Sequence, residues 1–205
     1  RKTGIYLTVL GVGLDNLNDL TMQKLAQAGN GNAAYIDSLL EARKVLKEEL
    51  ASTLFPIAND VKIQVEFNPA RVAEYRLIGY ETRALKREDF NNDQVDAGDI
   101  GSGHVVTALY EITPAGGKRQ VDPLRYGQEP QRQAHGSEIA YLKLRYKLPG
   151  QERSRLVERP IGDGDRLPAL DAAPADLRFA AAVAGFGQLL SGSDYMKGFG
   201  FADAA

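Results

Sequence analysis

The stretch VKIQVEF, residues 61–67, decides the fold class of this chain. Its apolar positions are Val61, Ile63, Val65 and Phe67, and its polar positions are Lys62, Gln64 and Glu66. Because successive side chains of a strand point to opposite faces, this strict alternation predicts a β-strand with one buried face and one face in water. Such one-sided strands are typical of antiparallel sheets.

Four further segments have strand character. They are residues 72–81, 104–113, 139–147 and 154–159. In the third, which contains YLKLRYK, the basic residues Lys143, Arg145 and Lys147 are expected to form a solvent-facing row that discourages pairing at a sheet edge. Several strands without long helices between them predict an antiparallel β-sandwich over residues 56–160, with an irregular loop at residues 114–137.

The sequence before this region has a different pattern. GIYLTVL, residues 4–10, is almost continuously apolar, which predicts a strand covered on both faces as in a parallel sheet. A helix with the sequence LTMQKLAQA should follow, capped by Asn18 or Asp19 and ended by Gly29 or Gly31.

A second strand and helix come next. AAYI, residues 33–36, is a short strand candidate, and Ser38 with Glu41 forms a capping box at the start of a helix. The apolar face of that helix is expected to be Leu39, Ala42, Leu46 and Leu50. Residues 1–55 therefore predict the strand, helix, strand, helix order of an α/β sheet.

The C-terminal part is expected to be helical. Residues 160–174 contain Gly, Asp and Pro and are expected to form a linker, and Asp176 can cap the largely apolar helix LRFAAAVAGFGQLL. The residues expected to pack this helix against the rest of the chain are Phe179, Val183, Phe186 and Leu190. The whole chain is thus predicted to be α+β, with an α/β part at 1–55, a sandwich at 56–160, and a linker and helix at 161–205.

Composition excludes several classes of function. The chain has 205 residues, enough for a real core, and no cysteine, which excludes thiol catalysis, thiolate metal sites and disulfides. Its 25 basic and 27 acidic residues give a net charge of -2, so no overall field favours nucleic acid or an anionic membrane. No window holds the roughly 18 apolar residues of a membrane helix. We therefore expect neither nucleic-acid binding nor membrane insertion by this chain.

One polar run invites a metal-site interpretation. It is FNNDQVDAGDIGSGH, residues 90–104, whose aspartates are Asp93, Asp96 and Asp99. An EF-hand loop that started at Asp89 would need glycine at its sixth position and glutamate at its twelfth, but Gln94 and Ile100 stand there. A polar turn that leads into a strand explains the run better, because Asn and Asp bond to nearby backbone and Gly permits sharp turns. No metal site is predicted.

Catalytic motifs are equally incomplete. The two histidines, His104 and His135, have no partner in a recognisable motif, and no nucleophile elbow, H-E-x-x-H pair or P-loop occurs. GVG at residues 11–13 lacks the third glycine of a dinucleotide fingerprint. We predict a non-enzyme with no catalytic, cofactor-binding or metal-binding residues, and no cofactor. The alternative left open is a small-ligand-binding or hydrolytic domain that uses Asp96, Asp99 and His104.

Longer stretches resemble a known family. IYLTVLGVG, LAQAGNGNAAYID and LEARKVLKEEL resemble the last third of a von Willebrand factor type A (VWA) domain. The rest is similar to the region that follows such a domain in bacterial YfbK-like proteins, through VKIQVEFNPARVAEYRLIGYETR, EDFNNDQVDAGDIGSGHVVTALYEI, LRYKLPG and FAAAVAGFGQLLSGSDY. The resemblance spans almost the whole chain.

The resemblance implies a binding role and little else. VWA domains bind protein partners, often through a metal held by an Asp-x-Ser-x-Ser loop, but that motif is absent here, so no metal ligand is carried over. A protein-interaction or structural module of a bacterial protein is implied, with a protein partner of unknown identity and a cell-envelope location for an exported or lipid-anchored parent. The chain is expected to be a fragment of that parent, and its incomplete VWA sheet is expected to favour self-association.

Overall fold

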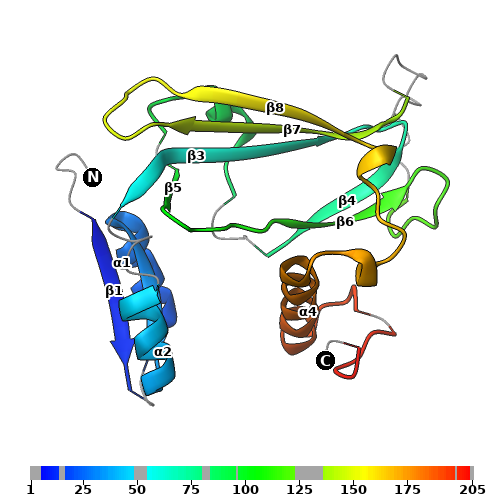
Figure 1. The fold of residues 1–205 in the computed structure, drawn as a ribbon. Helices are drawn as coiled ribbons and strands as arrows, with labels where there is room; N and C mark the ends of the chain where they lie inside the picture. The colour runs from blue at the N-terminus through cyan, green and yellow to red at the C-terminus, as the bar shows by residue number, and fades with distance from the viewer. Residues whose placement is uncertain are drawn as a thin grey trace. The chain divides into compact units, whose positions relative to one another are not determined.

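Strands make up most of the middle of the chain in the computed structural model (Figure 1). The structure describes residues 6–13, 17–48, 55–79, 84–95, 97–122, 136–196 and 198–203. The class is α+β, as the sequence predicts. The chain forms two compact units that interleave along the sequence. Unit 1 comprises Arg1–Ile63, Lys86–Val105 and Leu144–Val157, and unit 2 comprises Gln64–Leu85, Val106–Lys143 and Glu158–Ala205.

The N-terminal part of unit 1 has the predicted strand, helix, strand, helix order. Its elements are β1 (Leu7–Val12), α1 (Asp19–Ala28), β2 (Asn30–Ile36), α2 (Leu39–Arg43) and a π-helical turn, η1 (Lys44–Glu48). β1 and β2 pair in parallel, with Val12 opposite Ile36. Both predicted caps are present, because Asn18 accepts a hydrogen bond from the Thr21 amide and Ser38 accepts one from the Glu41 amide. The order and the helix starts predicted from the sequence are therefore confirmed.

Burial in this part differs from the prediction. β1 was expected to be covered on both faces, but Leu7 is 49 % exposed and Val12 is 77 % exposed. Leu39 in α2 and Leu46 in η1, both on the predicted packing face of the second helix, are also exposed, and Leu50 lies outside the described residues. The physical reason is that, among the described residues, the parallel sheet has only two strands, too few to cover both faces.

Six strands form the two other sheets. They are β3 (Pro56–Phe67), β4 (Val72–Ile78), β5 (Gly98–Gly101), β6 (Leu109–Pro114), β7 (Glu138–Lys147) and β8 (Arg155–Gly162). One sheet has the order β5-β3-β7-β8, and the other pairs β4 with β6. The β3–β5 and β4–β6 pairs are antiparallel. These strands confirm the antiparallel pattern expected after residue 55.

Several strand positions depart from the prediction, and the strand expected over 72–81 ends at Ile78. The strand expected over 104–113 begins only at Leu109, and β5 falls where a turn was expected. β5 has no apolar alternation and contains two glycines, so no period-two signal marks it. β8 continues through Pro160 into the expected linker, which is possible because it is the last strand in the sheet order, where proline is tolerated.

Unit 2 is held together by an aromatic cluster. The ring centroid of Phe67 lies 4.5 Å from that of Tyr75 and 5.3 Å from that of Tyr110. These rings join the end of β3 to β4 and β6, and Val72 and Ala140 are buried in the same unit. Phe67 therefore lies on a packed face, as the alternation of residues 61–67 predicts.

The C-terminal helix α4 (Ala175–Leu190) is present but packs differently from the prediction. Its N-cap is Pro174, with Asp176 in the first turn, so Asp176 is not the cap. The side chains expected to pack inward are exposed: Phe179 71 %, Val183 53 %, Phe186 47 % and Leu190 67 %. Gly185 is buried instead, and a Cβ there would stand 3.0 Å from the Phe199 ring. The helix packs through its small residues, which leaves the large apolar ones outside.

The remaining elements are short. They are the 3-10 turns η2 (Arg87–Asn91), η3 (Asp163–Asp165) and η4 (Leu170–Ala172). Within the ranges that the structure describes, no helix is long and apolar enough to cross a membrane.

Candidate functional site

The residues singled out from the sequence do not form one site. Asp99 lies on β5, is half-buried and accepts a hydrogen bond from the Asp60 amide at 3.0 Å. His104 is exposed beyond the end of β5, and no hydrogen bond between the Asp99 and His104 side chains occurs in the described part of the chain. Asp96 and His135 lie outside the described residues. These residues are close in sequence, but the Asp99 carboxylate bonds to the Asp60 amide and not to His104.

Carboxylates and histidines are not gathered for metal binding in the described residues. No group of three or more His, Cys, Asp or Glu side chains there is placed to hold an ion. The described aspartates of the 90–104 run bond instead within this chain: Asp99 accepts from the Asp60 amide, and Asp93 accepts from the Ser154 amide and hydroxyl.

The most unusual polar residue is Lys62 on β3. Its side chain is buried, with only 3 % of the residue exposed. The Nζ atom donates hydrogen bonds to the backbone carbonyls of Asp89, at 3.3 Å, and of Asn92. These acceptors belong to residues 86–95, which we call the strap. A buried ammonium group needs such partners because burial without them is strongly unfavourable.

Lys147 on β7 forms the second contact with the strap. Its Nζ atom donates to the backbone carbonyl of Asp93 at 2.8 Å and forms an ion pair with Asp60 Oδ2 at 2.6 Å. The side chains of this pair are only 13 % and 18 % exposed. Asp60 has a positive φ of 51°, a conformation that Asp tolerates better than most residues. Its other oxygen accepts from the Ala97 amide, so Asp60 fixes both Lys147 and the chain beyond the strap.

Arg145, two residues before Lys147, forms the third contact. Its Nη2 donates to Asn91 Oδ1 at 3.1 Å, and its Nη1 donates to Ser154 Oγ at 2.7 Å. The guanidinium also lies over the Phe90 ring, 5.8 Å from its centroid. Its Nε is buried without a hydrogen-bond partner. We call Lys62, Arg145 and Lys147 the basic cluster.

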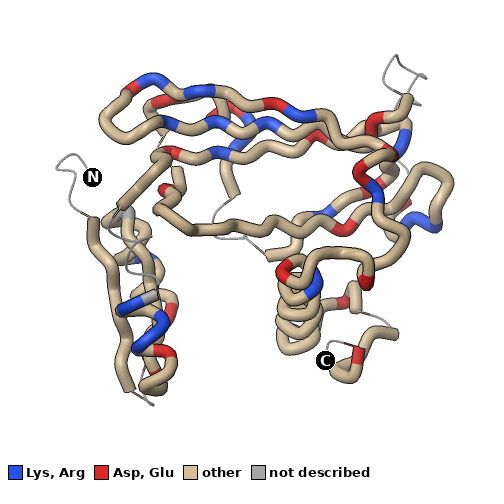
Figure 2. The backbone as a smooth tube through the Cα atoms, viewed as in Figure 1, with Lys and Arg blue, Asp and Glu red and all other residues tan. Residues whose placement is uncertain are grey.

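The basic cluster corrects the prediction of a solvated strand face. Lys62, Arg145 and Lys147 were expected to point into water, but all three contact the strap. Figure 2 shows basic residues recurring along β7, whereas β3 carries a single one, Lys62. The only sequence signal for this arrangement is the polar run FNND in the strap, whose oxygens match the three basic groups. The interpretation of this run as a polar turn is consistent with its bonds.

Burial and hydrogen bonds shift three pKa values here. Burial lowers the pKa of Lys62, since it penalises the charged ammonium. Burial also raises the pKa of Asp99, against the opposing hydrogen bond from the Asp60 amide. The hydrogen bond from the Ser154 hydroxyl lowers the pKa of Asp93. Stability linked to Asp93 is therefore present above its ordinary pKa and is lost as the pH falls.

The raised pKa of Asp99 gives a testable pH dependence. A folded carboxyl with a raised pKa binds its proton more readily than the unfolded chain does, so its ionised form destabilises the protein at neutral pH. An Asp99→Asn chain keeps an oxygen to accept from Asp60 and should be as stable as the parent, or more stable, at pH 7. Solvent screening keeps the difference within about 1 kcal/mol.

The difference in stability between the Asp99→Asn chain and the parent should shrink as the pH falls toward 3.8, the ordinary pKa of an aspartate. There the folded parent's Asp99 is also largely neutral, because its pKa is raised. Urea unfolding of both chains across this range measures it. A clear loss of stability in the Asn chain at neutral pH would show that the charge itself is required.

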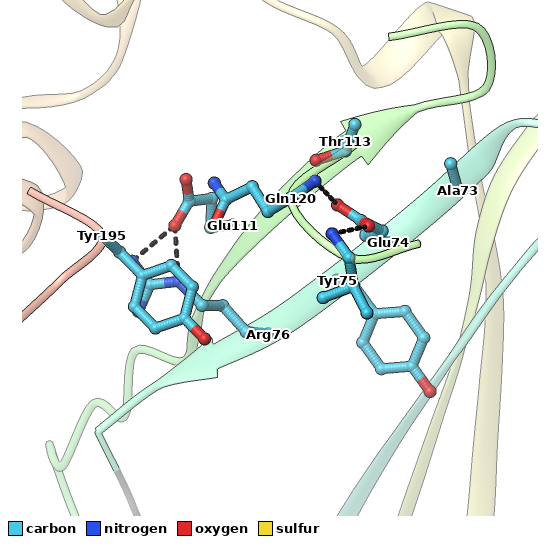
Figure 3. A pocket seen from close by; sticks show the side chains of 9 residues that line it. Ala73, Glu74, Tyr75, Arg76, Glu111, Thr113, Gln120 and Tyr195 are labelled. Carbon is cyan, nitrogen blue, oxygen red and sulfur yellow. Dashed lines mark hydrogen bonds and ion pairs between the residues drawn. The ribbon is translucent and has the colours of Figure 1, made fainter. Parts of the chain in front are cut away.

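Unit 2 contains an open pocket of about 340 Å³ (Figure 3). Arg76 lies at its edge, donating to Glu111 Oε2 at 2.6 Å and to Gln188 Oε1 at 2.7 Å, with the Tyr195 ring centroid 4.0 Å from its guanidinium carbon. Arg76 thereby connects β4 and β6 to α4 and the segment after it.

The pocket's other carboxylate, Glu74, is also engaged. Its two oxygens accept hydrogen bonds from the Gln120 and Val121 amides, both at 2.9 Å, and these bonds lower its pKa. The charged groups of the pocket thus hold parts of unit 2 together. Their chemistry fits a structural role better than proton transfer, which needs a group free to exchange its proton with a substrate.

Comparison with known proteins identifies the family of the chain. Residues 52–205 match the family described as "Uncharacterized protein YfbK, C-terminal". The chain is 48 % identical over 199 residues to "Uncharacterized protein YfbK" of Escherichia coli (strain K12), a match that covers 96 % of this chain. It spans about a third (34 %) of that relative's length. No solved structure matches it. The chain therefore belongs to the YfbK family, whose C-terminal region it contains.

Proposed function

We propose that this chain is a non-catalytic protein-interaction module of a bacterial envelope protein, and that it binds its partner through α4. The observation that carries the proposal is the apolar face of α4. Its residues, Phe179, Val183, Phe186 and Leu190, are 47 % to 71 % exposed. Large exposed apolar side chains that lie together are a usual mark of a protein-binding surface.

The spacing of these residues supports a single binding face. They stand at i, i+4, i+7 and i+11, which places them on one side of a helix. Phe201 extends the face, because its ring lies 5.7 Å from the Phe186 ring and is itself exposed. Aromatic residues dominate the energy of many protein interfaces. The opposite side of α4 is occupied by the contacts of Gly185 and Gln188 within unit 2.

The contacts of the polar groups favour binding over catalysis. Asp99, Glu74 and Glu111 all accept hydrogen bonds from this chain. The alternative of a ligand-binding or hydrolytic site at Asp96, Asp99 and His104 would need Asp99 to exchange its partners. We therefore rank it below the protein-interaction module.

A pull-down from a bacterial envelope extract tests the binding face. The chain serves as bait, and a second bait carries Phe179→Ser and Val183→Ser. A control carries Leu156→Ser and Val157→Ser, which remove two exposed apolar side chains from β8. We expect the α4 bait to capture at least about tenfold less partner, because two apolar contacts are lost from the interface.

The control bait should retain the partner. Circular dichroism of all baits checks that they are folded. Equal capture by the α4 bait and the parent, or no specific partner for any bait, would contradict the proposal.

We further propose that residues 1–55 are the end of a VWA-like sheet and that the chain self-associates through it. Support comes from the parallel β1–β2 pair and its exposed Leu7, Leu10 and Val12. Parallel sheets are normally covered on both faces. An untagged copy of the chain added to the pull-down should be captured by the tagged bait, and a bait with Leu10→Lys and Val12→Lys should capture less. Failure to capture the copy at all would contradict self-association.

A further inference from the structure

The strap is attached to β3 and β7 mainly by hydrogen bonds. Phe90 is its one residue classed as buried, at 4 % exposure, while residues 86–88, 91, 92 and 94 are exposed. The other attachments are the hydrogen bonds from Lys62, Arg145 and Lys147 and the bond from the Ser154 amide to Asp93. A segment with so little buried apolar surface belongs to the less stable parts of a fold and can open locally.

Most hydrogen bonds of the basic cluster beneath the strap go to neutral acceptors, although the Asp60 and Asp93 carboxylates also act on the charge of Lys62. Lys62 donates only to backbone carbonyls, and Arg145 donates only to an amide oxygen and a hydroxyl. Among the ion pairs of the described residues, the basic cluster contributes one, between Lys147 and Asp60. The ionised donors already strengthen these bonds, and an anionic acceptor would add the attraction between opposite charges. An oxyanion would therefore be a better partner for Lys62 and Arg145 than the strap is.

The unpartnered Nε of Arg145 is an independent sign that the basic cluster can take a further acceptor. It is a buried donor without an acceptor, which is rare in folded proteins and calls for an explanation. A guanidinium binds a carboxylate or phosphate with two parallel N–H groups, and Nε is commonly one of them. Lys147 lies two residues after Arg145 on β7, and Lys62 lies on the neighbouring strand β3. Both contact the strap, as Arg145 does.

We propose that the strap is a latch over an oxyanion-binding site formed by Lys62, Arg145 and Lys147. A phosphate or carboxylate group displaces the strap and takes the places of the Asp89 and Asn92 carbonyls and the Asn91 amide oxygen. β3 and β7 stay paired while the strap is open. This inference is independent of the α4 surface and holds whether or not α4 binds a protein.

Hydrogen exchange with inorganic phosphate as the probe tests the latch. Peptides from the strap are compared with peptides from β3 and β7, in phosphate and in sodium chloride of equal ionic strength. We expect strap amides to exchange at least about tenfold faster than strand amides, and phosphate to speed the strap further while chloride does not. A parallel series with acetate distinguishes carboxylate from phosphate as the preferred anion.

Two kinds of variant distinguish opening of the strap from anion binding by the basic cluster. Phe90→Ala removes the buried anchor and should tighten phosphate binding, measured by calorimetry, by the same factor by which it raises strap opening, because the closed state no longer competes. Phe90→Leu serves if the Ala chain does not fold. Arg145→Met should abolish the response to phosphate, whereas the control Lys143→Met, on the same strand, should not.

Two results would overturn the proposal. Strap and strand peptides that exchange at the same rate would show that the strap opens only with the whole unit. A strap that opens alone but responds equally to phosphate and chloride would show that the basic cluster is not an oxyanion site.

Discussion

Replacing Lys147 with Met is expected to lower the free energy of unfolding by about 3 kcal/mol or more, the usual range for breaking a buried ion pair. The substitution leaves the Asp60 carboxylate, whose side chain is only 18 % exposed, without its charged partner. It also leaves the Asp93 carbonyl without a donor. The result follows from the low exposure of both groups, because water cannot replace the lost contact easily.

A double-mutant cycle isolates the pair. Asp60→Asn should also be strongly destabilising, although Asn tolerates the positive φ at this position. The double substitution should cost less than the sum of the two, with a coupling of at least about 1 kcal/mol, because each single change strands the other group. Unfolding by urea, followed by circular dichroism, gives the four free energies.

The ion pair of Lys44 with Glu41 is the matched control. It also joins a lysine Nζ to a carboxylate oxygen, at 3.2 Å, but its side chains are 52 % and 34 % exposed. Lys44→Met should change the free energy of unfolding by less than about 0.5 kcal/mol, as expected for a surface pair. A Lys147→Met chain that loses no more than the Lys44→Met chain would show that water reaches Asp60 freely.

Local signals in the sequence located most elements correctly. Asn18 and Ser38 cap the helices that they were expected to cap, because capping depends on groups within three residues of each other. The alternation over residues 61–67 identified β3, since side-chain direction along a strand is also a local property. β5 carries no such local signal and was missed.

Burial could not be predicted in the same way. On β3, Lys62 is 3 % exposed and Ile63 is 44 % exposed, the reverse of the expected order. Alternation states which residues share a face but not which segment covers that face. Here the strap covers the polar face at Lys62, and it lies 27 residues away from it in the sequence, counted to Asp89.

The candidate site shows the same limit. Asp99 and His104 were chosen because they are close in sequence, yet Asp99 bonds to Asp60, 39 residues away. The ion pair of Asp60 with Lys147 joins residues 87 positions apart. The charge pattern on β7 suggested a solvated row, which is the usual fate of alternating basic residues in a strand. Only the path of the strap makes these groups a buried cluster.

At the C-terminal end of β3, Phe67→Ala is expected to lower the free energy of unfolding by about 3 kcal/mol. This is the lower end of the range for core aromatic residues, because Phe67 is not fully buried. The ring contacts Tyr75 and Tyr110, so the substitution removes two aromatic contacts and leaves a cavity between β3, β4 and β6.

Ile63→Ala is the control for Phe67→Ala, because Ile63 belongs to the same predicted apolar face but is 44 % exposed. Its loss should be less than half that of Phe67→Ala, since less apolar surface returns to water. Urea unfolding of both chains measures the difference. Equal losses would mean that the four apolar residues of VKIQVEF are buried alike, as the alternation alone predicts. The unequal losses expected here would instead show that the covered face of β3 changes along the strand, from the polar side at Lys62 to the apolar side at Phe67.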